Sequence, residues 1–113
     1  MKFITRLCFL ICLTNAPLAF GFDFEGCSVE EVIVAGSSNA HVRLDCTISP
    51  RPECATSYTY FGFDKSTKEG EQYLSVVLTA FASGAKVTGL VHDTDCPLVQ
   101  GNVTLLQHIR LTR

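Results

Sequence analysis

Two cysteines, Cys27 and Cys46, bracket a twenty-residue segment, CSVEEVIVAGSSNAHVRLDC, with a run of small residues in its middle. A reversal at the Gly36–Ser37 peptide turns the segment into a β-hairpin in which the two cysteines face each other. Val29 then faces Leu44 on the same, mostly apolar side. A slip of one residue would move every side chain to the wrong side. The pattern therefore predicts a hairpin closed by a Cys27–Cys46 disulfide.

The same register assigns the acidic residues of the first strand. Glu31 is expected opposite Val42 on the apolar side, and Glu30 opposite Arg43 on the polar side. Because neighbouring residues of a strand point to opposite faces, Glu30 and Glu31 are expected on opposite sides of the hairpin. This arrangement excludes the two carboxylates as a catalytic pair.

Residues 1–21 have the order of a secretory signal peptide. Lys2 and Arg6 precede the apolar run LCFLICL, and the small residues of TNAPLAFG follow it. The apolar run is too short to span a bilayer. Cleavage is expected after Gly21, with cleavage after Ala19 as the alternative. The remaining residues, 22–113, suffice for a single small domain, which we expect to be secreted or periplasmic.

The leader contains two of the six cysteines. The remaining four are Cys27, Cys46, Cys54 and Cys96. An even number in a short exported chain indicates disulfides, with three possible pairings. The hairpin favours Cys27–Cys46, which leaves Cys54–Cys96. A four-cysteine zinc site would need CxxC pairs, which are absent, so no metal is expected.

The charge of the chain limits its partners. Two of the nine Lys and Arg residues lie in the leader, so seven remain against eleven Asp and Glu, a formal charge of −4. There is no basic run or stripe, which argues against nucleic acid as the partner. No second long apolar segment follows the leader, so no membrane span is expected.

After the hairpin, strand and helix patterns alternate. Residues 22–26 are expected to be a short lead-in, residues 57–64 the third strand, and residues 85–91 and 103–111 the last two strands. The apolar side of the last strand is expected to consist of Val103, Leu105, Ile109 and Leu111.

Residues 68–84, KEGEQYLSVVLTAFASG, have the apolar period of a helix. Ser66 with Glu69 fits a capping box, and Gly84 fits the left-handed position that ends a helix. The broad side expected to be buried consists of Tyr73, Leu74, Val76, Val77, Leu78, Ala80 and Phe81. The opposite, polar side consists of Glu71, Gln72, Ser75, Thr79 and Ser83.

The predicted order is three strands, one helix and two strands. This is the order of the OB-fold, a mainly β five-stranded barrel with one helix, held here by disulfides. The alternative is an open α+β sheet with the helix on one face.

The segment GEQYLSVVLTAFASGAKVTGLVHDTDCPLVQGNVTLLQHIRL, residues 70–111, resembles small exported bacterial proteins related to the pentameric B subunits of A-B toxins, such as the subtilase cytotoxin B subunit. The resemblance covers roughly residues 54–111. It implies an OB-fold that forms a homo-oligomeric ring and binds cell-surface glycans for a separate catalytic subunit. The polar side of the helix would then line the ring; alternatively, it is simply the solvent-exposed side. The glycan-contacting residues of those subunits find no matching motif in this chain.

Two segments contain candidate binding residues. In Tyr58-Thr59-Tyr60-Phe61-Gly62-Phe63, the phenylalanines are expected in the core, and Tyr58 and Tyr60 face outward, where they can stack on a sugar or pack across strands. His92-Asp93-Thr94-Asp95 combines an imidazole with two carboxylates, but it lacks the further oxygens and the glycine turn of a calcium loop, so a solvated turn is expected.

No sequence motif indicates catalysis. The chain has no GxSxG, no HExxH and no glycine-rich phosphate loop, and the four cysteines outside the leader are expected in disulfides. We therefore expect a non-catalytic module without a cofactor that binds a glycan or a protein. The alternative is a monomeric envelope protein with a structural or inhibitory role.

Overall fold

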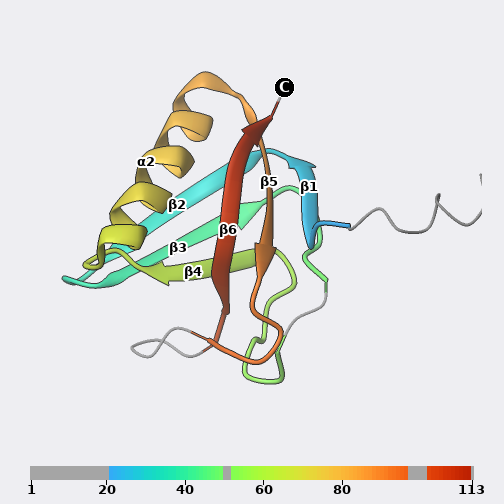
Figure 1. The fold of residues 1–113 in the computed structure, drawn as a ribbon, viewed down its shortest axis with the longest axis vertical. Helices are drawn as coiled ribbons and strands as arrows, with labels where there is room; N and C mark the ends of the chain where they lie inside the picture. The colour runs from blue at the N-terminus through green and yellow to red at the C-terminus, as the bar shows by residue number, and fades with distance from the viewer. Residues whose placement is uncertain (1–20, 50–51, 97–101, 113) are drawn as a thin grey trace, which may run out of the picture.

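The computed structural model describes residues 21–49, 52–96 and 102–112. Except for Gly21, the predicted leader lies outside the described residues. The described part forms one mixed six-stranded sheet and one helix, α2 (Lys68–Ser83), as Figure 1 shows. None of the helical structure within these ranges is long and apolar enough to cross a membrane.

The sheet contains strands that precede the helix in the sequence and strands that follow it. The strands are β1 (Phe24–Cys27), β2 (Val29–Ala35), β3 (Asn39–Leu44), β4 (Tyr60–Asp64), β5 (Lys86–Val91) and β6 (Thr104–Thr112). Their order is β1-β5-β6-β4-β3-β2, and every pair is antiparallel except β4 with β6. The prediction of a mainly β protein with one helix is confirmed. The predicted number of strands is wrong, and the described strands form an open sheet, so a closed barrel is not confirmed.

The additional strand, β1, is the segment predicted to be a lead-in. It pairs with β5 through an irregular register between Phe24 and Cys27. Gly26 has a φ of 63°, a conformation that suits glycine, and its N–H donates to Thr88 Oγ1 at 2.9 Å. The irregularity lets Phe24 and Cys27 both enter the core, although they are three residues apart.

The hairpin of β2 and β3 begins in the predicted register and then departs from it. Val29 pairs with Leu44 as expected, but a β-bulge follows, and from there Glu31 pairs with Arg43 and Val32 with Val42. The predicted pairing of Glu31 with Val42 is therefore wrong. A bulge adds one residue to one strand, which shifts every later pair by one position.

Phenylalanine rings form the centre of the core. Phe61 and Phe63 are buried, as predicted, and Phe61 stacks on Phe24 with ring centroids 5.5 Å apart. In β6, however, Leu106 is buried and Leu105 only partly so. A register shift at Gln107 reverses the alternation there, so the predicted apolar side of this strand is wrong in part.

Helix α2 packs chiefly against β2 and β6. Its N-cap is Thr67, whose side chain accepts from Gly70 N, rather than the predicted Ser66. Gly84 ends the helix in the left-handed conformation, as expected. The buried side is narrower than predicted, because two of its expected members, Leu78 and Phe81, are 46% and 53% exposed.

Both predicted disulfides are present. Cys27–Cys46 joins the end of β1 to the residues after β3, and Cys54–Cys96 joins the loop before β4 to the loop between β5 and β6. Two disulfides are consistent with an extracellular or periplasmic protein.

Candidate functional site

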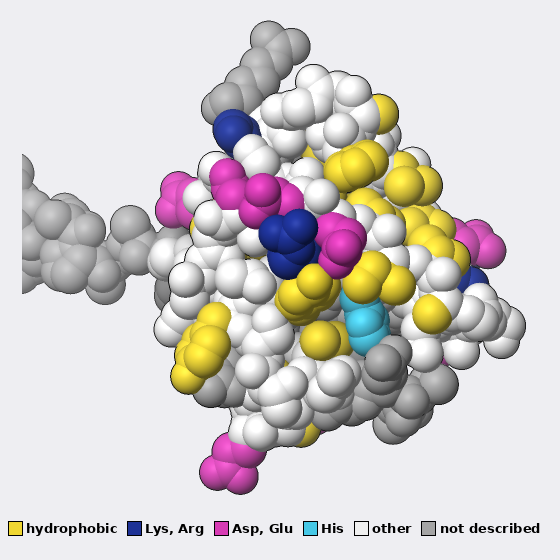
Figure 2. Space-filling model, turned by 180° about the vertical axis from the view of Figure 1, so that it is seen from behind, with side chains coloured by type: hydrophobic (Ala, Val, Ile, Leu, Met, Phe, Trp, Pro, Cys, Tyr) yellow, Lys and Arg dark blue, Asp and Glu magenta, His cyan; other side chains and the backbone are white. Residues whose placement is uncertain are grey.

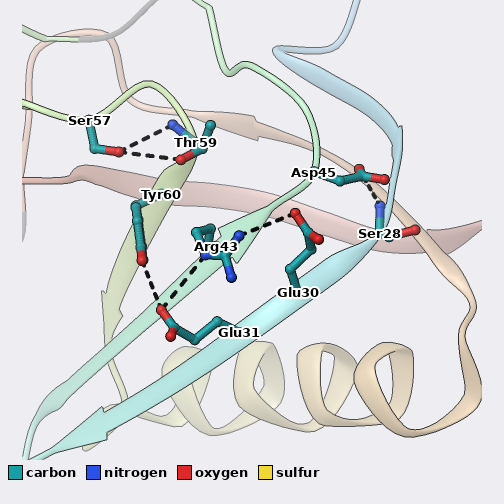
Figure 3. A network of polar contacts seen from close by, with 8 residues as sticks. All are labelled: Ser28, Glu30, Glu31, Arg43, Asp45, Ser57, Thr59 and Tyr60. Carbon is teal, nitrogen blue, oxygen red and sulfur yellow. Dashed lines mark hydrogen bonds and ion pairs between the residues drawn. The ribbon is translucent and has the colours of Figure 1, made fainter.

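The outer face of β2, β3 and β4 has a network of polar side chains centred on Arg43 (Figure 3). The Arg43 guanidinium donates from Nη1 to Glu30 Oε1 at 3.2 Å, and its Nε lies 3.9 Å from Glu31 Oε1. The same oxygen of Glu31 accepts from the Tyr60 hydroxyl at 2.8 Å. Three strands thus contribute to one group of linked side chains.

The bulge in β2 creates this network. Without it, Glu30 and Glu31 would point to opposite faces of the strand, as the sequence predicted. With it, both carboxylates reach the same guanidinium, so that prediction is wrong. Strand pairing then aligns Glu31, Arg43 and Tyr60 in one row across the three strands.

The network lies at the surface and contributes little to the stability of the fold. The side chains of Arg43, Glu30 and Glu31 are between 37% and 45% exposed, and ion pairs of this kind contribute about 0–1 kcal/mol. The hydrogen bond to Glu31 raises the pKa of the Tyr60 phenol, which keeps its O–H a donor. These side chains are therefore accessible to a ligand and already held in position.

Two further side chains belong to this part of the chain, Tyr58 in the loop just before β4 and His41 in β3. Tyr58, two residues before Tyr60, is 53% exposed. His41, two residues before Arg43 on β3, is 8% exposed, and its Nε2 has no hydrogen-bond partner among the described residues. Burial lowers the pKa of this imidazole, because it penalises the charged form.

The space-filling view in Figure 2 shows the side of the molecule that faces away from the viewer in Figure 1. Near its centre, acidic side chains flank a basic one, and a histidine and several hydrophobic side chains lie next to them. Acidic, basic, histidine and hydrophobic side chains therefore occur close together on one exposed face.

A cavity of about 260 Å³ lies beside the start of α2. Phe63 and Leu106 contribute apolar surface, and several polar residues line it as well. The polar groups are used by the fold: Thr67 Oγ1 caps the helix, and the Tyr73 hydroxyl donates to the Gln107 carbonyl oxygen at 2.8 Å. We therefore assign this cavity to the contact that fixes the start of α2 against the sheet, and not to a binding site.

Among the described residues of the loop after β5, no three potential metal ligands lie within reach of one another. His92 Nδ1 lies 3.9 Å from Asp95 Oδ2, while Asp93 is exposed. In the described ranges, the only group of three potential ligands within reach of one another is Cys27, Asp45 and Cys46. Both sulfurs of that group form a disulfide, so it offers no thiolate.

The polar side of α2 faces solvent. The residues expected to line a ring, Glu71, Gln72, Ser75, Thr79 and Ser83, are all exposed. Thr79 and Ser83 donate their hydroxyls to carbonyl oxygens one turn earlier in the helix. That this side lines a ring stays a prediction.

Comparison of the chain with protein-family models, with curated proteins and with solved structures found no match. The resemblance to toxin B subunits therefore stays a prediction, and the functional argument depends on the residues of this chain.

Sequence reasoning identified Tyr58 and Tyr60 and placed Glu30 beside Arg43, but it missed that Glu31 joins Arg43 to Tyr60. The spacing of Val29 and Val32 in β2 was the available signal: these two residues, of which Val29 is buried and Val32 packs against the core, are three residues apart rather than two. A strand whose buried residues skip one position contains a bulge. Ile33 concealed this signal. In a strand without a bulge, Ile33 would lie on the same side as Val29, so that side would also look apolar.

Proposed function

We propose that this chain is an exported, non-catalytic module that binds carbohydrate through the outer face of β2, β3 and β4. The observation that carries the proposal is the row Glu31–Arg43–Tyr60, with exposed Tyr58 two residues before Tyr60. Export is supported by the predicted leader and by the two disulfides.

The chemistry of this row suits a sugar. A carboxylate accepts from two neighbouring hydroxyl groups, and a guanidinium donates to ring or hydroxyl oxygens in a fixed geometry. Tyrosine adds a flat ring on which the apolar face of a sugar packs. Arg43 and Tyr60 hold Glu31 in place, so little side-chain freedom is lost when a ligand binds.

The arrangement argues against glycoside hydrolysis. That reaction needs two carboxyl groups on opposite sides of the scissile bond. Here Glu30 and Glu31 contact the same guanidinium and lie together on one side of the sheet. Binding without bond cleavage is therefore the function that we propose.

We also propose that the strands form an OB-type barrel. β1 and β2 stand at opposite ends of the sheet order, yet only Ser28 separates them in the chain, so they would act as one long bent strand. β3 and β4 would then be the second and third strands. OB-folds bind oligosaccharides and oligonucleotides on that part of the barrel, which is where Arg43 and Tyr60 lie.

A homo-oligomer, as in toxin B subunits, is a further part of the proposal. It is favoured by large apolar side chains that remain exposed on and near α2. Phe81 is 53% exposed, Leu78 46% and Val34 55%. Large apolar side chains that are exposed together mark surfaces for protein–protein contact.

A glycan array followed by calorimetry tests the carbohydrate proposal. We expect the oxidised protein, residues 22–113, to bind a defined set of glycans. Tyr60→Ala should weaken the best of them about tenfold or more, because a stacked ring contributes about 1.5 kcal/mol. Tyr60→Phe should lose less, since it keeps the ring. Gln72→Ala, on the exposed side of α2, is the control. An array without hits would refute the proposal.

A further inference from the structure

Resting on this proposed function, we infer that the carbohydrate recognised by the outer face of β2, β3 and β4 is uncharged, and that the face selects against sialylated and other anionic glycans.

The charges of the network carry this inference. Two carboxylates, Glu30 and Glu31, share one guanidinium within 4 Å, so the group has a formal charge of −1. Lys65 and Lys86 make their hydrogen bonds elsewhere, to the Gly36 carbonyl oxygen and the Ser28 hydroxyl. An anion approaching this row therefore meets a net negative charge.

Arg43 is not available as an anion receptor. A guanidinium binds a carboxylate best with two parallel N–H groups. In this network Nη1 of Arg43 faces Glu30 and its Nε faces Glu31. A sialic acid carboxylate would have to replace one of these partners, and both belong to the protein.

The remaining hydrogen-bonding capacity suits hydroxyl groups. The contacts of each glutamate in the network run through Oε1, so Oε2 is the oxygen with which each accepts from a ligand. Tyr60 donates its proton to Glu31, so its oxygen is left to accept. A surface that mainly accepts is complementary to a ligand that mainly donates, as the hydroxyl groups of a neutral sugar do.

His41 provides an independent observation. It lies two residues before Arg43 on the outer face of β3, more than nine-tenths buried, and its Nε2 lacks a partner among the described residues. Buried polar atoms normally have a partner. A neutral imidazole nitrogen pairs with a hydroxyl group in either tautomer, whereas it pairs with a carboxylate only in the tautomer in which it carries the hydrogen. Burial lowers the pKa of His41, so this imidazole stays neutral and adds no positive charge that would attract an anion.

The test uses an array on which each neutral glycan is printed beside its sialylated form, for example lactose beside sialyllactose. We expect the wild-type protein to bind the neutral member of each recognised pair at least tenfold more tightly. The double variant Glu30→Gln and Glu31→Gln keeps the shape of both side chains and leaves Arg43 without a negatively charged partner. Its preference for the neutral member should fall at least tenfold.

Glu71→Gln is the matched control, because it makes the same chemical change on the exposed side of α2. Added salt is a second measurement that needs no variant: it should reduce the preference of the wild-type protein, because salt screens repulsion between exposed charges. Equal or tighter binding of sialylated glycans by the wild-type protein would overturn the inference and leave the proposed function standing. An array without any binding would refute the proposed function, and the inference with it.

Discussion

Replacing Gly70 by alanine tests how the start of α2 is built, because two physical effects predict opposite changes in the stability of the protein. Gly70 lies in the first turn of the helix and is buried. At an ordinary helix position, alanine is about 1 kcal/mol more favourable than glycine. Helix propensity alone therefore predicts that Gly70→Ala stabilises the protein.

The surroundings of Gly70 predict the reverse. A Cβ atom at this position would overlap the Asp64 carbonyl oxygen and lie 2.7 Å from the Asp64 carbonyl carbon and 2.9 Å from Lys65 Cα. These are backbone atoms, and hydrogen bonds from Thr67 N and Thr67 Oγ1 to the same carbonyl oxygen hold the turn. Overpacking costs about 1–3 kcal/mol, and contact with backbone belongs at the upper end of that range. Subtracting the gain in propensity leaves a net loss of about 2 kcal/mol.

Urea unfolding of the oxidised protein measures this loss. The control is Ser75→Ala, an exposed position of the same helix, where a change of a few tenths of a kcal/mol in the stabilising direction is expected. Gly70→Ala should lower the unfolding midpoint, while the slope of the transition should not change. A midpoint that rises or stays the same would show that the helix does not approach the Asp64–Lys65 backbone this closely.

Two further predictions concern the buried side chain of His41 and the proposed oligomer. Burial lowers the pKa of His41 from its usual 6.5, so as the pH falls this imidazole binds a proton in the unfolded chain before it does so in the folded protein. The free energy of unfolding is therefore unaffected by protonation of His41 above pH 6.5 and decreases as the pH falls below that value, by at most about 1.4 kcal/mol per pH unit. His41→Leu should flatten this dependence in urea unfolding between pH 7.5 and pH 5, and an unchanged slope would contradict the assignment. Phe81→Glu should dissociate the proposed oligomer in light scattering, whereas Glu53→Ala, an exposed position outside α2, should not; a wild-type protein that is monomeric at all concentrations would refute the assembly.

The strongest local patterns in the sequence predicted the corresponding structure correctly. The cysteines at the ends of the hairpin form the expected disulfide, because Val29 pairs with Leu44 next to it. The alternation around Phe61 and Phe63 placed both rings in the core. A disulfide constrains the hairpin, and a regular alternation of side chains between the two faces constrains the strand that contains Phe61 and Phe63.

The errors arose where the period is interrupted. The bulges next to Glu30 and at Gln107 each reverse the alternation of a strand, and a pattern of period two has no place for an extra residue. β1 was missed because Glu25 and Gly26, both exposed, separate its two buried residues. Leu78 and Phe81 fit the apolar side of the helix, but the small sheet covers only part of that side. The candidate site depends on the first of these bulges. The sequence therefore predicted Tyr60 and the proximity of Glu30 to Arg43, but not the position of Glu31.

Mapping a bound glycan onto the protein by NMR tests the central claim most directly. The wild-type protein would be labelled with ¹⁵N and titrated with the neutral glycan that binds best on the array. We predict that the largest changes in amide chemical shift occur at Glu31, Arg43 and Tyr60, on the three strands that form the network. Changes confined to α2 or to the loop that contains His92 would contradict the account.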